Sequence, residues 1–236
     1  MGYRERPAGV PGVVLWERSV RAGPARSRIL PDGCLDLIWD GRQLTVAGPD
    51  LVARWHESPE STSYTALRFH AGTGPAALGV PASELAGLSP ALDGVWPSAG
   101  ARRLTERVAS GPSGPGAALA SWAAEAVAAG GGVDPIGPRV HAMAGHGVPV
   151  AAMADRLGLS ERQLRRRCLP LFGYGPRRLA RILRMNRALA AALDGRPLAD
   201  VAFGCGYADQ AHFSRDLLDL SGATPTSLLA ELGRAA

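Results

Sequence analysis

The sequence contains no lysine, so its 26 basic side chains, histidine aside, are all arginines. It has three cysteines, Cys34, Cys168 and Cys205, which lie far apart and form no CxxC pair. Such scattered thiols build no disulfide framework and fit a reducing, cytoplasmic location. The chain also lacks any apolar run of about 18 residues and any apolar segment near its start. We therefore expect no membrane span and no secretory signal.

Motifs for catalysis are missing as well. The chain has no Walker motif, nucleophile elbow, HExxH or GxGxxG sequence. The common signatures of nucleotide hydrolysis, acyl transfer, zinc proteolysis and dinucleotide binding are therefore absent. We expect no enzyme, no catalytic residue, no metal and no cofactor.

The positive charge is concentrated in the C-terminal part. Residues 1–137 carry 12 arginines and 13 acidic residues, a net charge of −1, whereas residues 138–236 carry 14 arginines and 8 acidic residues, a net charge of +6. A basic C-terminal part favours a polyanionic partner. The alternative is a solubility effect combined with a coding bias that replaces lysine by arginine.

The N-terminal part is predicted to be rich in β-structure. Leu35 to Trp39 and Leu44 to Ala47 are short apolar runs separated by Asp40-Gly41, which predicts a hairpin. Tyr64 to His70 alternates in polarity and predicts a half-buried strand, and Val13 to Trp16 predicts an edge strand. Weaker patterns predict helices near residues 81–87, 104–108 and 117–129. Short strands separated by turns indicate a small β-barrel or sandwich with flanking helices.

A Gly- and Pro-rich stretch, Gly130 to Pro138, divides the chain. We place an N-terminal domain at residues 1–130, a linker at 131–137 and an all-helical domain at 138–236. The predicted fold class is α+β.

The C-terminal part contains a duplicated pattern. Val148 to Gly175 matches Arg196 to Gly222 at an offset of 48 residues, with one extra residue in the second turn. Each copy predicts a short helix, a glycine turn and a second helix, and the amphipathic segment Pro176 to Leu193 predicts a long helix between them. This is a pair of helix-turn-helix units.

Packing inside each unit requires small residues where its helices cross and an apolar anchor on its second helix. The predicted small residues are Ala151, Ala154 and Gly158 in the first unit, and Ala199, Ala202 and Gly206 in the second. The predicted anchors are Leu164 and Phe213, and Pro170 is expected to kink or end the first unit's second helix.

The second helix of such a unit places its N-terminal residues in the major groove of DNA. The candidate DNA contacts are Ser160, Arg162, Gln163, Arg165 and Arg166 in the first unit, and Asp209, Gln210, His212, Ser214 and Arg215 in the second. Arginine binds guanine or a phosphate, and glutamine suits adenine. The alternatives are a solvated arginine face and, for His212, a hydrogen bond within the helix pair.

At these residues the chain resembles the AraC/XylS family of bacterial transcription regulators. The resemblance covers Pro138 to Leu232 and includes LSERQLRRRC and VAFGCGYADQAHFSRDL. It implies two helix-turn-helix subdomains joined by one long helix, with recognition helices in successive major-groove segments about 34–36 Å apart. Leu30 to Trp39, with Leu67 to Phe69, is similar to the poorly characterised N-terminal domain of short AraC-type regulators. That likeness implies a cupin-like β-barrel that binds a small effector or mediates dimerisation.

The expected function is therefore that of a sequence-specific regulator on double-stranded DNA, modulated by a small-molecule effector. RNA polymerase and a second copy of the chain are further expected partners. The alternative is a nonspecific architectural DNA-binding protein, which shows strong salt dependence and little sequence discrimination.

The candidate effector-binding residues are Cys34, Trp39, His56, Tyr64 and His70. Cys34 with the two histidines suggests an effector or metal site, but their order and spacing match no metal motif. The aromatic residues line either a cavity or the core, and core packing is favoured. A cupin-type metal enzyme is a lesser alternative, because only two histidines lie in the β-rich region. A methyl-accepting DNA-repair domain needs a four-cysteine zinc site that three scattered cysteines do not supply.

Overall fold

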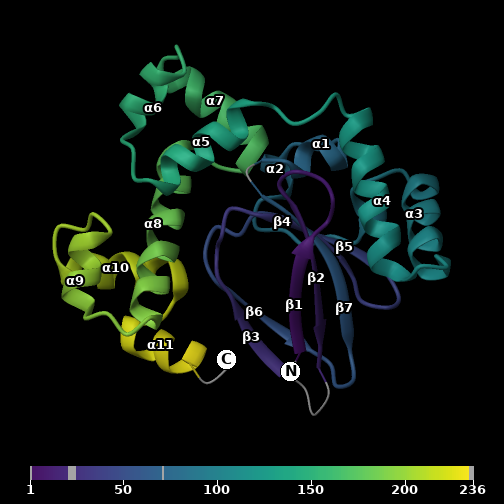
Figure 1. Cartoon of the computed structure of the whole chain (residues 1–236), viewed down its shortest axis with the longest axis horizontal. Helices are drawn as coiled ribbons and strands as arrows, with labels where there is room; N and C mark the ends of the chain where they lie inside the picture. Colours follow the sequence, from purple (N-terminus) through teal and green to yellow (C-terminus); the bar gives the residue numbers. More distant parts are fainter. Residues whose placement is uncertain (1, 21–24, 71, 234–236) are drawn as a thin grey trace.

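The computed structural model describes residues 2–20, 25–70 and 72–233. Strands fill the first part of the chain and helices the rest (Figure 1). The strands are β1 (Gly2–Pro7), β2 (Val13–Ser19), β3 (Ala25–Ile29), β4 (Leu35–Trp39), β5 (Leu44–Ala47), β6 (Arg54–Ser58) and β7 (Ser63–Phe69). The helices that cover them are α1 (Gly74–Leu78), α2 (Ala82–Leu85), the 3-10 turn η1 (Leu92–Gly94), α3 (Ser98–Ser110) and α4 (Gly114–Ala129). The remaining helices are α5 (Ile136–Gly145), α6 (Val150–Arg156), α7 (Glu161–Phe172), α8 (Pro176–Leu193), α9 (Leu198–Gly204), α10 (Gln210–Ser221) and α11 (Pro225–Gly233).

The strands form two antiparallel sheets. Five pair in the order β1-β2-β7-β4-β5, and β3 pairs with β6. The predicted strands at β4, β5 and β7 are confirmed. The prediction of an edge strand at β2 is wrong, because β1 pairs with its outer side. Within the described residues no strand joins the two sheets, so the expected closed barrel is not shown.

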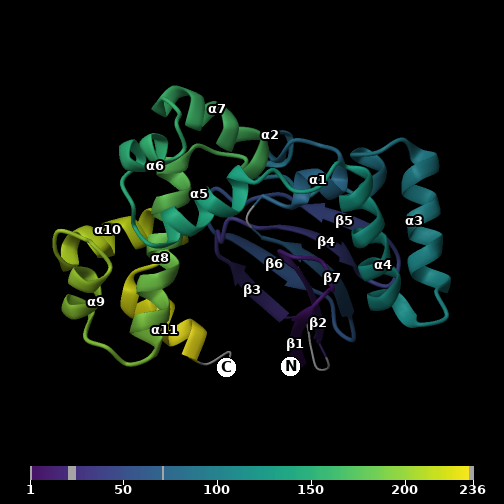
Figure 2. The ribbon, with the colours of Figure 1, turned by 45° about the horizontal axis from the view of Figure 1, so that its top comes forward.

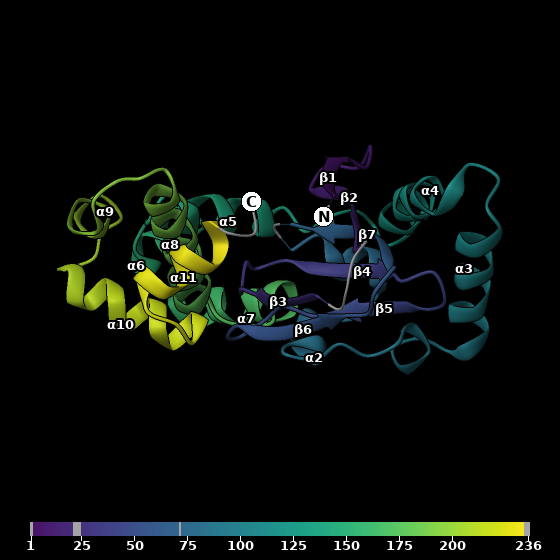
Figure 3. The same ribbon diagram turned by 90° about the horizontal axis from the view of Figure 1, so that it is seen from below.

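The large sheet has two different faces. Along β4, Leu35, Leu37 and Trp39 are buried on one face, where they belong to a core that also includes residues of α1, α3 and α4. Asp36 and Ile38 point to the other face, toward the β3–β6 pair. Figure 3 shows β3 and β6 lying across from β4.

The C-terminal helices gather around α8 (Figures 1 and 2). Leu179, Ile182 and Met185 of α8 are fully buried among α5, α7 and the later helices. The expected apolar face ends earlier than predicted, since Leu193 in the last position of α8 is 48% exposed. Helix α7 continues through Pro170 to Phe172, so this proline does not end the helix, which was one of its two predicted effects. Pro170 lies on the exposed side of the helix, where water can satisfy the carbonyl that the missing N–H leaves free.

The two parts of the chain are packed together as well as linked. Helix α4 ends at Ala129 and α5 begins at Ile136, within the predicted linker. The backbone N–H of Ala53 donates to the carbonyl of Leu220 at 2.7 Å, at the end of α10. Arg28 of β3 donates to the carbonyl of Ser221 at 2.6 Å and pairs with Glu231 of α11 at 3.1 Å. The β3–β6 pair is therefore in direct contact with the last helices of the chain.

Among the described residues, no helix combines the length and the apolar character needed to cross a membrane.

Candidate DNA-binding surface and ligand cavity

The duplicated pattern folds into two matching helix pairs, α6 with α7 and α9 with α10. The first helices both have seven residues and follow a proline, and the second helices both have twelve. Gly158 and Gly206 form the turns with φ values of 66° and 79°, a left-handed conformation that favours glycine. Both second helices end at another left-handed glycine, Gly173 or Gly222.

The same position anchors each second helix. Leu164 and Phe213 are fully buried, which confirms the predicted anchors. Ala154 and Ala202 are buried as expected where the helices cross. Ala151 and Ala199 were also expected there, but both are exposed in the first turn of their short helices.

Each second helix begins at a side chain that caps it. Ser160 accepts from the backbone N–H of Gln163 at 3.2 Å, and the side-chain oxygen of Gln163 accepts from the backbone N–H of Ser160 at 2.8 Å. Asp209 accepts from the backbone N–H of His212 at 2.6 Å. Ser160, Gln163 and Asp209 thus satisfy backbone donors at the helix starts. Among the described residues, the amide nitrogen of Gln163 has no hydrogen-bond partner.

Arginines dominate the exposed face of α7. Arg162, Arg165 and Arg166 are exposed, and in the described part of the chain none of them has an ion-pair partner. Arg167 differs, because it pairs with Asp134 at 2.8 Å. Three unpaired guanidinium groups therefore face solvent along the first turns of α7.

The exposed face of α10 is more mixed. Gln210 and Arg215 are exposed, and Arg215 has the same place after Phe213 that Arg166 has after Leu164. Ser214 donates its hydroxyl to the carbonyl of Gln210 at 2.8 Å. His212 accepts from the backbone N–H of Ala208 at 3.3 Å, and its ring meets the Tyr207 ring edge-on. His212 thus makes a hydrogen bond within the helix pair, which is one of the two roles predicted for it.

A buried carboxylate, which the sequence reasoning missed, holds α10 against α8. Asp216 is 6% exposed and accepts from Arg181, from Arg184 at 3.1 Å and from the hydroxyl of Tyr207 at 3.0 Å. Burial, followed by the charge of Asp216, raises the pKa of Tyr207, so its hydroxyl stays protonated as a donor. One sequence signal could have predicted this burial: Asp216 is an acidic residue on the apolar stripe formed by Phe213, Leu217 and Leu220.

The five candidate effector residues separate in space. His56 and Tyr64 face a cavity of about 410 Å³ between the large sheet and the β3–β6 pair. Trp39 points to the opposite face of the sheet and is buried in the core. Cys34 and His70 pair with each other instead, with 3.1 Å between Sγ and Nδ1. The structure thus brings together two residues of the predicted set at the cavity.

The cavity wall is aromatic with a polar end. Trp16 and Tyr64 line it, with His56 3.4 Å from the Tyr64 hydroxyl. Asp36 accepts from Arg68 Nε at 3.1 Å and from Trp16 Nε1 at 3.3 Å. Burial raises the pKa of Asp36, although the charge of Arg68 acts in the opposite direction. The arrangement suits a compact ligand that combines an apolar or aromatic body with hydrogen-bonding groups.

Comparison with known protein families identifies a domain in each part of the chain. Residues 153–231 match the model of an AraC-type helix-turn-helix domain, and residues 13–89 match a domain of unknown function, DUF6597. The chain contains an AraC-type helix-turn-helix domain. The first match contains α7 to α10, and thus both anchored second helices.

Solved structures with a similar chain trace include ToxT from Vibrio cholerae O395, at 11% identity over 92% of this chain and 97% of that chain, with a TM-score of 0.47. A probable AraC family transcriptional regulator from Rhodopseudomonas palustris CGA009 is 22% identical over 42% of this chain and 97% of that chain, with a TM-score of 0.37. A DNA-binding transcriptional dual regulator from Escherichia coli K-12 is 23% identical over 43% and 95%, with a TM-score of 0.36. No curated protein matches the chain.

Proposed function

We propose that this chain is a transcription regulator that reads a specific DNA sequence by placing α7 and α10 in two adjacent major-groove segments. The observation that carries the proposal is the equivalence of Arg166 and Arg215. Each follows a fully buried anchor by two residues and faces solvent near the start of its helix. A capped and anchored helix holds such side chains in a fixed direction, which base recognition requires.

The two helices differ in what they offer to DNA. Helix α7 presents Arg162, Arg165 and Arg166, which suit guanine O6 and N7 or phosphates. Helix α10 presents Gln210 and Arg215, and glutamine suits adenine. We expect the α7 half-site to be richer in guanine. We expect Ser160, Asp209, His212 and Ser214 to contribute mainly by fixing the helices.

Selection of bound sequences from random duplexes tests this function. Two enriched motifs about one helical turn apart are expected for the full chain. Arg166→Ala is expected to abolish the base preference at one position of the first motif, and Arg215→Ala at one position of the second. Each lost bidentate contact reduces discrimination by about 1–3 kcal/mol. Arg103→Ala, an exposed arginine on α3, is the matched control.

A selection that enriches no motif, with tight binding at low salt, would identify a nonspecific architectural protein instead. If motifs appear but are unchanged in both arginine variants, the assignment of α7 and α10 to base reading is wrong.

We further propose that the cavity between the sheets binds a small effector that modulates DNA binding. The support is its volume of about 410 Å³ and its wall of Trp16, Tyr64 and His56. Ile38→Trp would fill the cavity from the sheet without changing charge. A compound that binds there raises the melting temperature of the original chain and leaves that of this variant unchanged. RNA polymerase and a second copy of the chain remain predicted partners.

A further inference from the structure

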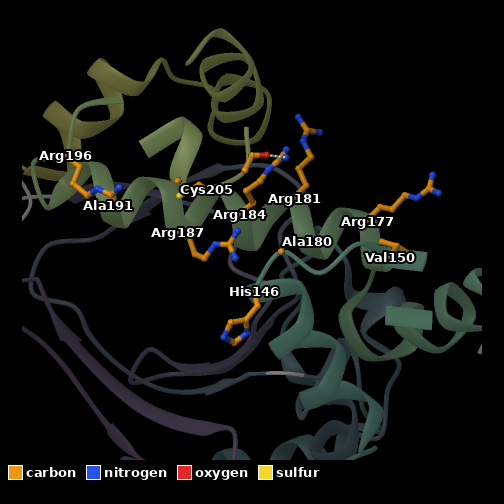
Figure 4. A pocket seen from close by; sticks show the side chains of 14 residues that line it. His146, Val150, Arg177, Ala180, Arg181, Arg184, Arg187, Ala191, Arg196 and Cys205 are labelled. Carbon is orange, nitrogen blue, oxygen red and sulfur yellow. Dashed lines mark hydrogen bonds between the residues drawn. The ribbon is translucent and has the colours of Figure 1, made fainter. Parts of the chain in front are cut away.

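A second basic surface lies beside α8, outside the residues proposed to read bases. Five arginines line a cleft of about 980 Å³ between the two helix pairs, and we call it the arginine cleft (Figure 4). They are Arg177, Arg181, Arg184 and Arg187 on α8, and Arg196 just before α9. The four on α8 follow one another at intervals of three or four residues, so they share one side of the helix.

Internal partners neutralise three of these arginines. Arg177 pairs with Glu161 at 3.1 Å, Arg184 pairs with Asp216 at 3.1 Å, and Arg181 bridges Asp216 and Asp219. No described carboxylate lines the cleft itself. The ion pairs offset the charge of these three guanidinium groups and leave the positive charge of the cleft to the remaining two.

Arg187 and Arg196 supply that unpaired charge. Within the described residues neither has an ion-pair partner. The Arg187 guanidinium lies against Gly147, where an added Cβ would be 3.6 Å from it, and that of Arg196 lies against Gly204, with a corresponding distance of 3.3 Å. Figure 4 shows Arg187 next to His146 and Cys205, and Arg196 farther along the cleft beside Ala191. Unpaired guanidinium groups of this kind suit phosphate oxygens.

The edges of the cleft lead to the starts of both second helices. Arg177 contacts Glu161, the first residue of α7. Arg184 donates to the carbonyl of Gly206 at 3.4 Å, in the turn that precedes α10. When two such helices occupy successive major-groove segments, the backbone that borders the intervening minor groove passes between them.

We propose that the arginine cleft binds phosphodiesters of the DNA backbone between the two major-groove segments, through Arg187 and Arg196. This inference rests on the proposed placement of α7 and α10 on DNA. Phosphate contacts carry no sequence information, but they set the register of the protein on the duplex. The cleft thus supplies affinity and register, while Arg166 and Arg215 supply discrimination.

Salt dependence of binding tests the proposal with the full chain. Binding of a fluorescent duplex is measured by anisotropy from about 50 to 200 mM salt, and each phosphate contact contributes about −0.9 to the slope of log K against log salt. The double variant Arg187→Ala with Arg196→Ala is expected to flatten the slope by about 1.8 on selected and scrambled duplexes alike. The ratio of the two affinities should stay unchanged.

Matched variants separate contact from bulk charge and from folding. Arg42→Ala with Arg103→Ala removes the same charge from exposed positions in the N-terminal part, and its slope should equal that of the original chain. Arg187→Lys with Arg196→Lys keeps the charge, and its slope should stay steep. Melting temperatures show that each variant is folded.

The inference is wrong if the double variant of Arg187 and Arg196 has the same salt slope as the control variant of Arg42 and Arg103. If selected duplexes still bind and still depend on Arg166 and Arg215, the proposed function survives that failure. Tripolyphosphate serves as the probe for a free phosphorylated ligand. A second outcome is that tripolyphosphate raises the melting temperature of the original chain but not of the Arg187 and Arg196 double variant, while the salt slope for DNA is the same in both. In that case the cleft binds a small ligand and the DNA assignment is wrong.

Discussion

Asp216 is the side chain whose loss should damage the second helix pair most. It is 6% exposed and receives hydrogen bonds from Arg181, Arg184 and Tyr207. Removing one member of a buried ion pair costs about 3–5 kcal/mol, since the remaining groups lose their partner. The arginine side chains are 33% and 25% exposed and can regain water, which places Asp216→Ala near about 3 kcal/mol, the lower end.

The nearby Asp219 provides a matched control. It contacts Arg181 at 2.9 Å, but its side chain is 68% exposed, so Asp219→Ala should cost only about 0.2–1 kcal/mol. For a chain of this length, about 3 kcal/mol corresponds to a fall in melting temperature of about 6–12 °C, against about 4 °C or less for the control. Thermal unfolding followed by circular dichroism measures both. Equal melting temperatures for the two variants would refute the role given to Asp216.

Three further outcomes follow from named contacts. Ser160→Ala breaks the capping box and should destabilise the chain by about 1 kcal/mol in thermal unfolding, whereas Ser160→Asp should retain most of the stability. Arg28→Ala should speed amide hydrogen exchange in α11 by removing the contact with Glu231, and Arg26→Ala, whose side chain is 59% exposed, should not. Burial, then neighbouring arginines, lowers the pKa of His56 below 6.5. The folded chain therefore loses stability as the pH drops from about 6.5 to the lowered pKa of His56, because the unfolded chain takes up the proton first. In His56→Gln the melting temperature should depend less on pH over this range.

The sequence predicted the helical part well because its signals are local. Glycine turns, capping residues and an apolar anchor recur 48 residues apart, allowing for one extra residue in the second turn. Each of these features acts within one or two helical turns, so no knowledge of the rest of the chain is needed. Asp216 was missed because its partners lie 32 and 35 residues earlier, on α8. Only the folded arrangement brings these charges together.

Only some strands of the two sheets could be predicted, because the others have no local signal in the sequence. Strands β4, β5 and β7 bury apolar side chains and show it in their sequence, whereas β1, β3 and β6 read GYRERP, ARSRI and RWHES. Pairing with a neighbouring strand stabilises these polar segments, and Arg26 and Arg28 stack on the ring of Trp55. Hydrogen bonding to a distant strand leaves no period-two pattern of hydrophobicity.

The β3–β6 pair limits how strongly the proposed effector in the cavity is able to affect the proposed DNA binding. Ile29 lines the cavity, whereas its neighbour Arg28 points the other way and binds the end of α10 through the carbonyl of Ser221. A ligand that displaces β3 must therefore disturb this contact. A hydrogen bond from a charged group contributes about 1.5–3 kcal/mol, so this route alone changes DNA affinity by at most about 10- to 150-fold. Arg28→Ala should abolish the ligand-dependent part of the affinity and leave binding without ligand measurable; an undiminished response in titrations with DNA would place the coupling elsewhere.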